Sequence, residues 1–261
     1  MLQRWILSGL KRAHRVVCVS KETQNDLLSL APELRERCET IENALNYPYA
    51  PMPLEEVRGH MASLGLADQI RPKGRFLFHI GGNQWYKNRE GVIRIFGRLC
   101  ALHPDLTANP PLSLVMAGTL PTEAMLLAID EENLGGKVIF LGAVTNEQLR
   151  ALYSRAEALV FPSLREGFGW PILEAQACGC PVVTSDRPPM NRLAGPAALV
   201  AAPDQQTEFA AKIGELLSES ELALAQRRDE GRHHAEGYDS QLFLKKILEA
   251  YKIIFGDSVL K

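Results

Sequence analysis

Short apolar runs recur along this chain, and most of them end in Gly, Ser or Pro. They are rich in β-branched and aromatic residues and are too short for typical helices, so they predict strands. Because apolar residues follow one another without polar alternation, both faces of these strands are expected to be buried, as in a parallel sheet. The predicted strands cover residues 16–20, 76–81, 112–117, 138–141, 158–161 and 182–184.

Helical patterns lie between the predicted strands. Apolar residues recur there at helical spacing over residues 90–101, 122–132, 146–155 and 174–178. This alternation predicts an α/β fold with a doubly wound parallel sheet. Ligands of such sheets bind beyond the carboxyl ends of the strands. The turns that follow Ile80, Ala117, Leu141 and Phe161 are therefore expected to share one rim that carries the chemistry.

The turn after the fifth predicted strand combines two glutamates with the start of a helix. Gly167 and Gly169 allow a tight turn close to a ligand, and Pro171 suits the first helical position. A helix N-terminus presents N–H groups and the positive end of its dipole, which favours phosphate. Glu166 and Glu174 border this turn, where their carboxylates can accept hydrogen bonds from hydroxyl groups. The alternative is that Glu166 is a solvated loop residue and Glu174 a first-turn residue favoured by the dipole.

A cation ends the turn that follows the second predicted strand. Gly81 and Gly82 allow close approach of the backbone to a ligand, and Asn83 and Lys87 follow them. Lys87 supplies an ammonium group that can neutralise a pyrophosphate. The alternative is an ordinary surface lysine at a helix start, although a cation there opposes the helix dipole and needs another reason to be present.

Composition fits a soluble enzyme domain without a nucleic-acid partner. With 261 residues and a net charge of −2, the chain can bury a sizeable core but lacks the basic field that a phosphate backbone requires. No run approaches the roughly 18 apolar residues of a membrane span, and the start of the chain lacks the pattern of a signal peptide. A cytoplasmic location is therefore expected. The five cysteines are odd in number and lack metal-binding spacing, which predicts reduced thiols.

The histidines do not form a recognisable metal site. His79, His103, His233 and His234 have no partner at ligand spacing, so structural or surface roles are expected, and His79 is a minor candidate because it lies near the rim. Neither a metal nor a cofactor is predicted. Thr119, in the turn after the third predicted strand, is expected to cap the following helix.

The glutamate turn resembles a known donor site. Residues 160–185 read VFPSLREGFGWPILEAQACGCPVVTS, which resembles the donor-site signature of retaining glycosyltransferases of the GT-B fold, family 4. The resemblance covers most of residues 40–255 and is most specific over residues 138–195. It also includes residues 140–142, 152–156, 185–190 and 194–195.

This resemblance implies transfer of a sugar from a nucleoside-diphosphate donor, with retention and without a metal. Lys87 matches the family's lysine on the donor diphosphate, Glu174 matches the residue that holds the ribose hydroxyls, and Glu166 matches the residue near the donor sugar and its reacting carbon. The turn at Leu141 resembles the segment beside the nucleobase. The implied donor-binding residues are Gly81, Gly82, Asn83, Lys87, Leu141, Gly167, Phe168, Gly169 and Glu174, and Glu166 and Lys87 are the implied catalytic residues.

One position departs from the family pattern. Gly82 stands where the family commonly has an arginine, so the usual pair of cations on the diphosphate is incomplete. A neutral hydrogen bond from Asn83, or the guanidinium of Arg89 or of another arginine, could replace it. The sequence leaves these alternatives open.

The beginning of the chain resembles only the last part of the family's first domain. We expect a remnant of this N-terminal acceptor domain over residues 1–38, a Rossmann-like donor-binding domain over residues 39–237, and a crossover helix over residues 238–261. Apolar residues of the remnant would then meet a partner chain or a second copy. A sugar or glycolipid acceptor and peripheral membrane association are further expectations.

Three functions are compatible with these patterns. The first is the donor-binding half of a retaining glycosyltransferase that acts in polysaccharide or glycoconjugate synthesis, with the missing domain supplied by another chain. The second is a truncated nucleotide-sugar-binding domain without activity of its own. The third is an epimerase or a phosphorylase on the same scaffold, but the sequence shows neither the proton-shuttling groups of the former nor the cofactor lysine of the latter.

Overall fold

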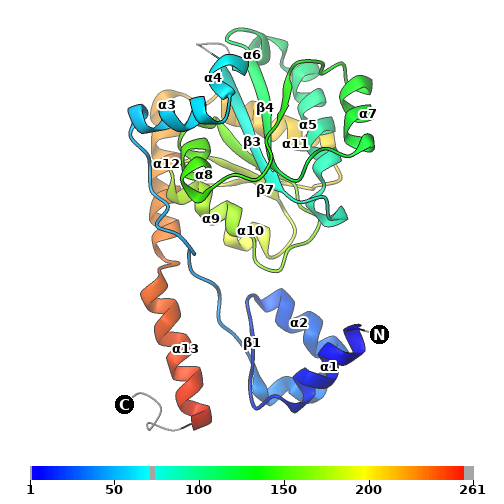
Figure 1. The fold of residues 1–261 in the computed structure, drawn as a ribbon, viewed down its shortest axis with the longest axis vertical. Helices are drawn as coiled ribbons and strands as arrows, with labels where there is room; N and C mark the ends of the chain where they lie inside the picture. Colours follow the sequence, from blue (N-terminus) through cyan, green and yellow to red (C-terminus); the bar gives the residue numbers. More distant parts are fainter. Residues whose placement is uncertain (1, 71–73, 256–261) are drawn as a thin grey trace. The chain divides into compact units, whose positions relative to one another are not determined.

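The computed structural model describes residues 2–70 and 74–255, so the last residues of the predicted crossover helix, 256–261, lie outside the described part. The chain divides into two compact units. The larger unit is formed by residues 47–237, and the smaller one by residues 1–46 together with residues 238–261. Figure 1 shows the larger unit as a sheet with helices on both faces.

A six-stranded sheet forms the centre of the larger unit. Its strand order is β5-β4-β3-β6-β7-β8, and all of its neighbouring strands are parallel. The strands are β3 (Arg75–Gly81), β4 (Leu112–Gly118), β5 (Val138–Phe140), β6 (Ala158–Phe161), β7 (Val182–Ser185) and β8 (Leu199–Ala201). The α/β fold with a doubly wound parallel sheet, predicted from the sequence, is confirmed.

Two groups of helices cover the sheet. Helices α5, α7 and α11 pack together on one face, and α3, α8, α9 and α12 pack together on the other (Figure 1). The elements are α3 (Leu54–Ser63), α4 (Leu66–Gln69), η2 (Trp85–Lys87), α5 (Arg89–Leu102), α6 (Pro104–Ala108), α7 (Glu123–Glu131), α8 (Asn146–Arg155), α9 (Trp170–Ala177), α10 (Met190–Leu193), α11 (Gln206–Leu217) and α12 (Glu221–Glu236).

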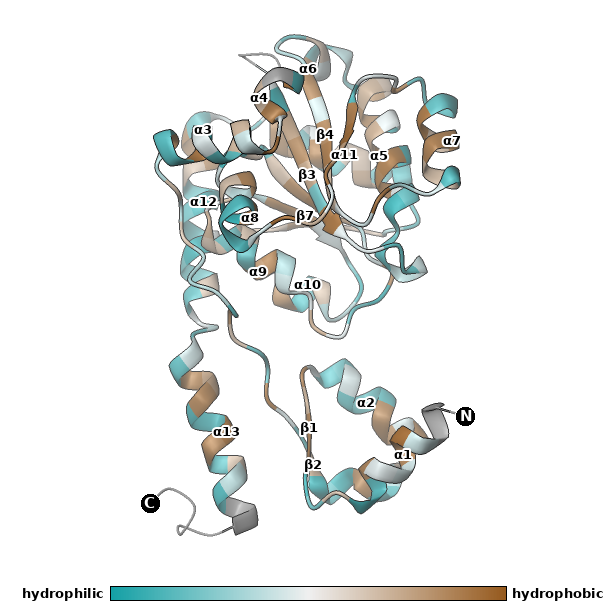
Figure 2. Cartoon of the chain, in the orientation of Figure 1, coloured by the Kyte–Doolittle hydropathy of each residue, from teal (hydrophilic) through white to brown (hydrophobic). Residues whose placement is uncertain are grey.

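The apolar runs form strands whose two faces are both buried beneath helices. Every residue of β6 and β7 is buried, and Phe76, Leu77 and Phe78 of β3 are at most 1% exposed. Phe96 of α5 and Phe209 of α11 belong to the core cluster on one face. Burying one such side chain contributes roughly 1.5–3 kcal/mol. Figure 2 shows the strands of the sheet mostly in brown, which marks this apolar character.

Local signals set several helix boundaries. Helix α8 covers the predicted residues 146–155, because Thr145 and Gln148 form a capping box at its start. Helix α9 begins at Trp170, earlier than predicted, with Gly169 at the N-cap in a left-handed conformation (φ 113°). Pro171 lies in its first turn, where a missing N–H removes no helical bond.

The capping prediction for Thr119 is wrong. Thr122 caps α7, and its Oγ1 accepts a hydrogen bond from the backbone N–H of Met125 at 3.4 Å. The reason is Pro121, because a residue that precedes a proline is disfavoured in helical conformation, so Leu120 does not begin the helix.

The carboxyl ends of four neighbouring strands meet at one edge of the sheet. Strands β5, β4, β3 and β6 are adjacent and parallel, so the turns that follow them share one rim, as predicted. Backbone hydrogen bonds join two of the turns: the N–H of Gly118 donates to the carbonyl of Gly142 at 3.2 Å, and the N–H of Leu141 donates to the carbonyl of Met116 at 2.8 Å. The rim is therefore a connected surface.

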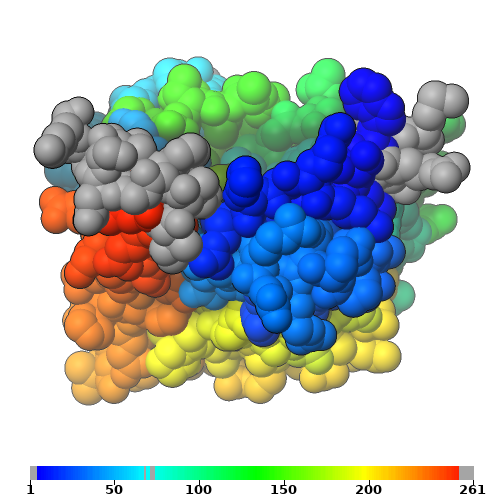
Figure 3. All heavy atoms as spheres, turned by 90° about the horizontal axis from the view of Figure 1, so that it is seen from below, coloured from blue at the N-terminus to red at the C-terminus, as the bar shows by residue number. Residues whose placement is uncertain are grey.

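The smaller unit contains a pair of parallel strands with helices beside it. Val16, Cys18 and Cys38 belong to its apolar cluster, whereas Trp5 and Ile6 are 81% and 55% exposed. In the space-filling view, the darkest blue atoms, those of α1, lie against lighter blue atoms of the segments that follow it in the chain (Figure 3). The elements are α1 (Leu2–Arg12), β1 (Val16–Cys18), α2 (Lys21–Leu30), η1 (Pro32–Arg37), β2 (Cys38–Thr40) and α13 (Ser240–Phe255).

Several elements were not predicted from the apolar pattern. They include β2 and β8, each of three residues, and helices α3, α11 and α12. Helix α13 begins close to the predicted start of the crossover helix, and brown and teal bands alternate along it in Figure 2. No helix within the described parts of the chain has the length and apolar character needed to cross a membrane.

Replacing Gly118 by alanine is expected to lower the free energy of unfolding by about 2 kcal/mol or more. Gly118 has a φ of 114°, and an added Cβ would overlap the carbonyl oxygen of Gly81 in the neighbouring turn. Strained backbone of this kind costs roughly 1–3 kcal/mol before the overlap is counted. Urea unfolding of the variant measures this loss.

The matched control is Gly135→Ala. An added Cβ at Gly135 meets no atom within 4 Å, and its φ is not in the left-handed region. The control is expected to stay within about 0.5 kcal/mol of the unmodified protein. Equal stability of the two variants would contradict the close approach of the β3 and β4 turns.

Candidate functional site

Lys87 and Glu166 form an ion pair at the rim. Lys87 ends η2, after β3, and Glu166 lies in the turn between β6 and α9. The Nζ atom of Lys87 is 2.8 Å from Oε1 and 2.9 Å from Oε2 of Glu166, and Ser163 Oγ donates to Oε1 at 2.8 Å. The two charged side chains are only 19% and 8% exposed. They are therefore neither a surface lysine nor a solvated loop glutamate.

The two rim turns are held together around this pair. The backbone N–H of Leu164 donates to the carbonyl of Tyr86 at 2.7 Å, and the ring of Phe161 lies 5.5 Å below the Nζ atom of Lys87. An ammonium over an aromatic face is stabilised by the ring quadrupole. Gly81 packs beside both side chains: an added Cβ would be in ordinary contact with Lys87 Cβ at 3.6 Å and tight against His79 Nε2 at 3.3 Å.

Glu174 is a buried carboxylate in α9. It is 6% exposed, and its Oε2 accepts a hydrogen bond from Tyr153 Oη at 3.0 Å. Burial raises the pKa of Glu174 from 4.5 to about 7, and the hydrogen bond from Tyr153 acts in the opposite direction. The sequence identified Glu174 but gave Tyr153 no role, because Tyr153 reads as an apolar position of α8.

Arg89 connects the turns that follow β3 and β4. It is 4% exposed, and its Nη1 donates to Asn83 Oδ1 and, at 2.8 Å, to the carbonyl of Thr119. Asn83 Nδ2 in turn donates to the carbonyl of Leu120 at 3.0 Å. A pocket of about 280 Å³ adjoins these residues and includes Thr122 in its wall. Of the alternatives for the missing arginine at Gly82, Arg89 and Asn83 therefore lie at the rim and bond to each other.

Within the described residues, neither Arg89 nor Glu174 has an oppositely charged partner. Among the ion pairs of the described residues, none includes either side chain. Two nitrogens of Arg89, Nε and Nη2, are buried without a hydrogen-bond partner, and desolvation lowers its pKa. Buried charges without counter-charges destabilise a fold, and they mark functional sites.

His79 lies below the rim and is inaccessible. It is fully buried, its ring stacks on Phe161, and its Nδ1 is 2.9 Å from the carbonyl oxygen of Val160. Burial, with smaller contributions from Arg89 and Lys87, lowers the pKa of His79 to about 3. A neutral ring that donates from Nδ1 satisfies this geometry. The minor candidacy of His79 as a general base therefore receives no support.

The remaining predicted residues line the same rim. Phe168 is 5% exposed and contacts the ring of Trp170 edge-on at 6.1 Å. Gly169 begins α9 without a side-chain cap, and Leu141 is 6% exposed beside the end of β4. No group of three or more His, Cys, Asp or Glu side chains suited to a metal ion occurs among the residues that the structure describes.

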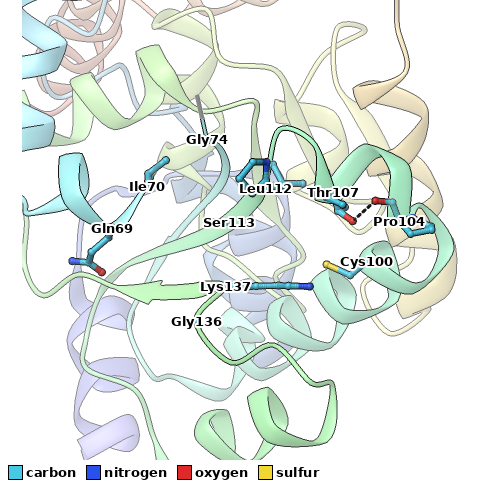
Figure 4. A pocket seen from close by; sticks show the side chains of 12 residues that line it. Gln69, Ile70, Gly74, Cys100, Pro104, Thr107, Leu112, Ser113, Gly136 and Lys137 are labelled. Carbon is cyan, nitrogen blue, oxygen red and sulfur yellow. Dashed lines mark hydrogen bonds between the residues drawn. The ribbon is translucent and has the colours of Figure 1, made fainter. Parts of the chain in front are cut away.

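A second pocket lies at the opposite, amino-terminal end of the sheet (Figure 4). It has a volume of about 380 Å³, and Cys100, Thr107, Ser113 and Lys137 line it. Thr107 Oγ1 bonds there to the carbonyl of Pro104 at 3.3 Å. This pocket shares no residue with the rim, so we do not assign it to the candidate site.

Replacing Glu174 by glutamine is expected to stabilise the protein at pH 8. The folded-state pKa of about 7 exceeds the ordinary value of 4.5, so the folded state holds the proton more tightly than the unfolded state. The stability of the unmodified protein therefore falls as the pH rises from about 4.5 to 7 and stays reduced above that range. Glutamine is neutral throughout. We expect a gain on the order of 2–3 kcal/mol at pH 8 and a small difference at pH 5.

Urea unfolding at the two pH values tests this expectation. The control is Glu147→Gln, which removes a half-exposed carboxylate that accepts from Tyr47. The control should not show the gain at pH 8, because burial does not desolvate its side chain. A loss of stability in Glu174→Gln at pH 8 would mean that Glu174 is stabilised as an anion by contacts other than Tyr153.

Two solved structures show the same fold. A glycosyltransferase from Rickettsia africae ESF-5 superimposes with a TM-score of 0.80 at 19% identity, covering 97% of this chain and 65% of that one. Anabaena Alr3699/HepE, in complex with UDP and glucose, gives a TM-score of 0.78 at 17% identity, with 97% and 68% covered. The parallel sheet thus matches glycosyltransferases of the GT-B type.

A curated relative matches along nearly the whole chain. The O-antigen chain mannosyltransferase B of Escherichia coli is 26% identical over 258 residues, which is 97% of this chain and 64% of that protein. The chain thus spans just under two thirds of this relative's length. Residues 67–233, which include the rim turns, Lys87, Glu166 and Glu174, match the family model of glycosyl transferases group 1. Because this match covers more than half of the sequence, the chain belongs to the glycosyl transferases group 1 family.

Proposed function

We propose that this chain is the donor-binding part of a glycosyltransferase, which moves a sugar from a nucleoside-diphosphate sugar to an acceptor hydroxyl. The observation that carries the proposal is the pairing of Lys87 with Glu166 at the carboxyl end of the sheet, next to the start of α9. Cation, carboxylate and helix N-terminus are the groups that a departing diphosphate and a positively charged sugar require. Membership of the family supports this assignment.

Lys87 is proposed to bind the donor diphosphate. As the bond between sugar and phosphate breaks, negative charge grows on the phosphate oxygens, and a nearby ammonium stabilises that charge. The backbone around Gly167, Phe168 and Gly169 adds the positive end of the α9 dipole. These groups supply positive charge from the chain itself, so the proposal assigns neither a metal nor a cofactor.

Glu166 is proposed to face the reacting sugar. Its two oxygens hold the Lys87 ammonium, and Ser163 fixes one of them. A carboxylate in this place can orient sugar hydroxyls and stabilise positive charge at the reacting carbon. We describe it as a site residue and not as a nucleophile. Retention of configuration, implied by the resemblance, is part of the proposal, and NMR of the glycosidic product would test it.

Glu174 is proposed to accept hydrogen bonds from the ribose hydroxyls, and Leu141 to lie beside the nucleobase. The buried position of Glu174 supports this role, because a carboxylate without a cation destabilises the fold and needs a functional reason. Arg89 and Asn83 hold the adjacent turns, and the backbone at Gly81 and Gly82 is proposed to lie close to the ligand. The name of the Escherichia coli relative makes a mannose donor the first to test.

Turnover is proposed to require a further domain. The relatives compared above extend beyond the region that this chain matches, and the apolar side chains of Trp5 and Ile6 are exposed on α1. We propose that a domain covering these side chains forms the acceptor side of the site. The acceptor, a sugar or glycolipid, the peripheral membrane association and the cytoplasmic location stay predictions.

Lys87→Ala is expected to weaken binding of nucleoside diphosphates by about 10- to 100-fold. A charge-assisted hydrogen bond of this kind contributes about 1.5–3 kcal/mol. Calorimetric titration with UDP, GDP and ADP measures the effect. The matched control is Lys212→Ala, which removes a lysine of α11 that also pairs with a glutamate, Glu215, at 2.8 Å. Unchanged affinity in Lys87→Ala, or equal losses in both variants, would refute the diphosphate assignment.

A turnover assay separates an active enzyme from a binding domain. Radiolabelled nucleoside-diphosphate mannose and other donors are supplied with a lipid-linked acceptor, with and without a candidate companion domain. We expect transfer only when the companion is present, and loss of transfer in Lys87→Ala. Donor binding without transfer under every condition would favour the alternative, a nucleotide-sugar-binding domain without catalytic activity.

A further inference from the structure

Tyr153 places a hydroxyl group against the buried carboxylate of Glu174. Its side chain is fully buried in α8, and its Oη donates to Glu174 Oε2 at 3.0 Å. A buried tyrosine hydroxyl needs a hydrogen-bond partner. For packing alone, phenylalanine would serve at this position, so the hydroxyl needs a separate explanation.

The ring of Tyr153 is held from two sides. Phe78 of β3 contacts it edge-on with centroids 5.3 Å apart, and Tyr49 contacts it edge-on at 6.1 Å. The helix that carries it is fixed at its start by the capping box of Thr145 and Gln148. The hydroxyl therefore has a defined position relative to the sheet, and it restricts the side-chain conformation of Glu174.

The surroundings of Glu174 otherwise oppose its charge. The titratable groups that face it are Tyr153 from α8, Tyr49 from the segment before α3, and Cys178, which caps the C-terminus of its own helix. All three are neutral when protonated, and within the described residues no cation pairs with Glu174. The Tyr153 hydroxyl is the hydrogen-bond donor that offsets part of the desolvation of this carboxylate.

Only one oxygen of Glu174 is used in this contact. Within the described residues, Oε2 accepts from Tyr153, and no hydrogen bond to Oε1 occurs. Glu174 Oε1 is not one of the buried side-chain atoms that lack a hydrogen-bond partner. Gln176 Oε1, in the same helix, is one of those atoms. The arrangement thus fixes one oxygen and leaves the other as an acceptor.

We propose that Tyr153 is a positioning residue for nucleotide binding, which keeps the Glu174 carboxylate ionised and oriented to accept hydrogen bonds from ribose hydroxyls. This inference rests on the proposed function, because it requires Glu174 to bind the ribose. In this inference, a residue on the buried face of α8 affects how tightly the rim binds the nucleotide. Tyr153 itself does not touch the nucleotide.

The inference predicts a pH dependence of binding. A proton on Glu174 occupies an acceptor oxygen, so binding should strengthen as the pH rises through the pKa of about 7. In Tyr153→Phe the carboxylate loses the donor that favours its charged form, and the midpoint of the binding curve should move to higher pH. At sufficiently high pH, part of the affinity should return.

Calorimetric titration of UDP, GDP and ADP between pH 6 and pH 9 tests this pH dependence. We expect Tyr153→Phe to bind the preferred nucleotide about 10-fold more weakly at pH 7, which corresponds to one hydrogen bond to a charged group. The loss should shrink towards pH 9. The control is Tyr47→Phe, which removes a hydroxyl bonded to the half-exposed Glu147. It should bind like the unmodified protein at every pH.

Two further measurements separate positioning from packing. With 2′,3′-dideoxy forms of the same nucleotides, Tyr153→Phe and the unmodified protein should bind equally, because the hydroxyls that Glu174 accepts from are missing. If Tyr153→Phe does not fold, site-specific 3-fluorotyrosine at position 153 replaces it. This more acidic phenol is a stronger donor and should move the midpoint to lower pH.

The outcomes distinguish this inference from the proposed function. Binding that depends on Glu174 but is identical in Tyr153→Phe at every pH would overturn the role of Tyr153 alone. An equal loss for ribose and dideoxy nucleotides would also overturn it, since a general packing defect would explain that result. If the unmodified protein binds none of the three nucleotides, the proposed function itself fails.

Discussion

Parallel pairing of β3 with β6 is the constraint on which the candidate site depends. Leu77 and Phe78 pair with Ala158 and Leu159, residues far apart in the sequence. Since parallel strands end at the same edge of a sheet, this register places the turn with Lys87 beside the turn with Glu166. Apolar burial on both faces holds the strands, and the rim chemistry follows from their direction.

Charge is distributed unevenly over this rim. Lys87 and Glu166 neutralise each other at 2.8 Å, whereas Arg89 and Glu174 are buried with no ionic partner in the part of the chain that the structure describes. A sequence selected only for stability would remove such charges or pair them. The free-energy cost of desolvating a charge exceeds the free energy that hydrogen bonds to neutral groups provide. Their presence at the carboxyl end of the sheet, where ligands of α/β proteins bind, supports the proposed binding site.

Glu174 shows how buried residues of the core position a side chain of the candidate site. The carboxylate belongs to α9, yet its hydrogen-bond donor comes from α8, and the ring of that donor contacts β3. Precise placement of a functional group therefore involves the core itself. This connection is the basis on which we propose that Tyr153, which does not touch the ligand, influences its affinity.

Much of the fold was predictable because its signals are local. Apolar runs bounded by Gly and Pro marked β3, β4, β6 and β7, and apolar residues at helical spacing marked α8. Short or weakly patterned elements such as β8 were missed. A run of three apolar residues also occurs often outside strands, so it does not by itself indicate a strand. Thr119 was misassigned as a cap because the constraint from Pro121 outweighed the preference of a threonine for that position.

The sequence by itself determined the fold class and the rim, because apolar strands alternate with helices and end in glycine turns. Its resemblance to the family's donor site predicted Lys87, Glu166 and Glu174 as site residues. Only the tertiary structure decided that Lys87 pairs with Glu166, that Arg89 joins two turns, and that Tyr153 meets Glu174. These contacts join residues distant in sequence. Their geometry depends on strand register and helix packing, which no local pattern encodes.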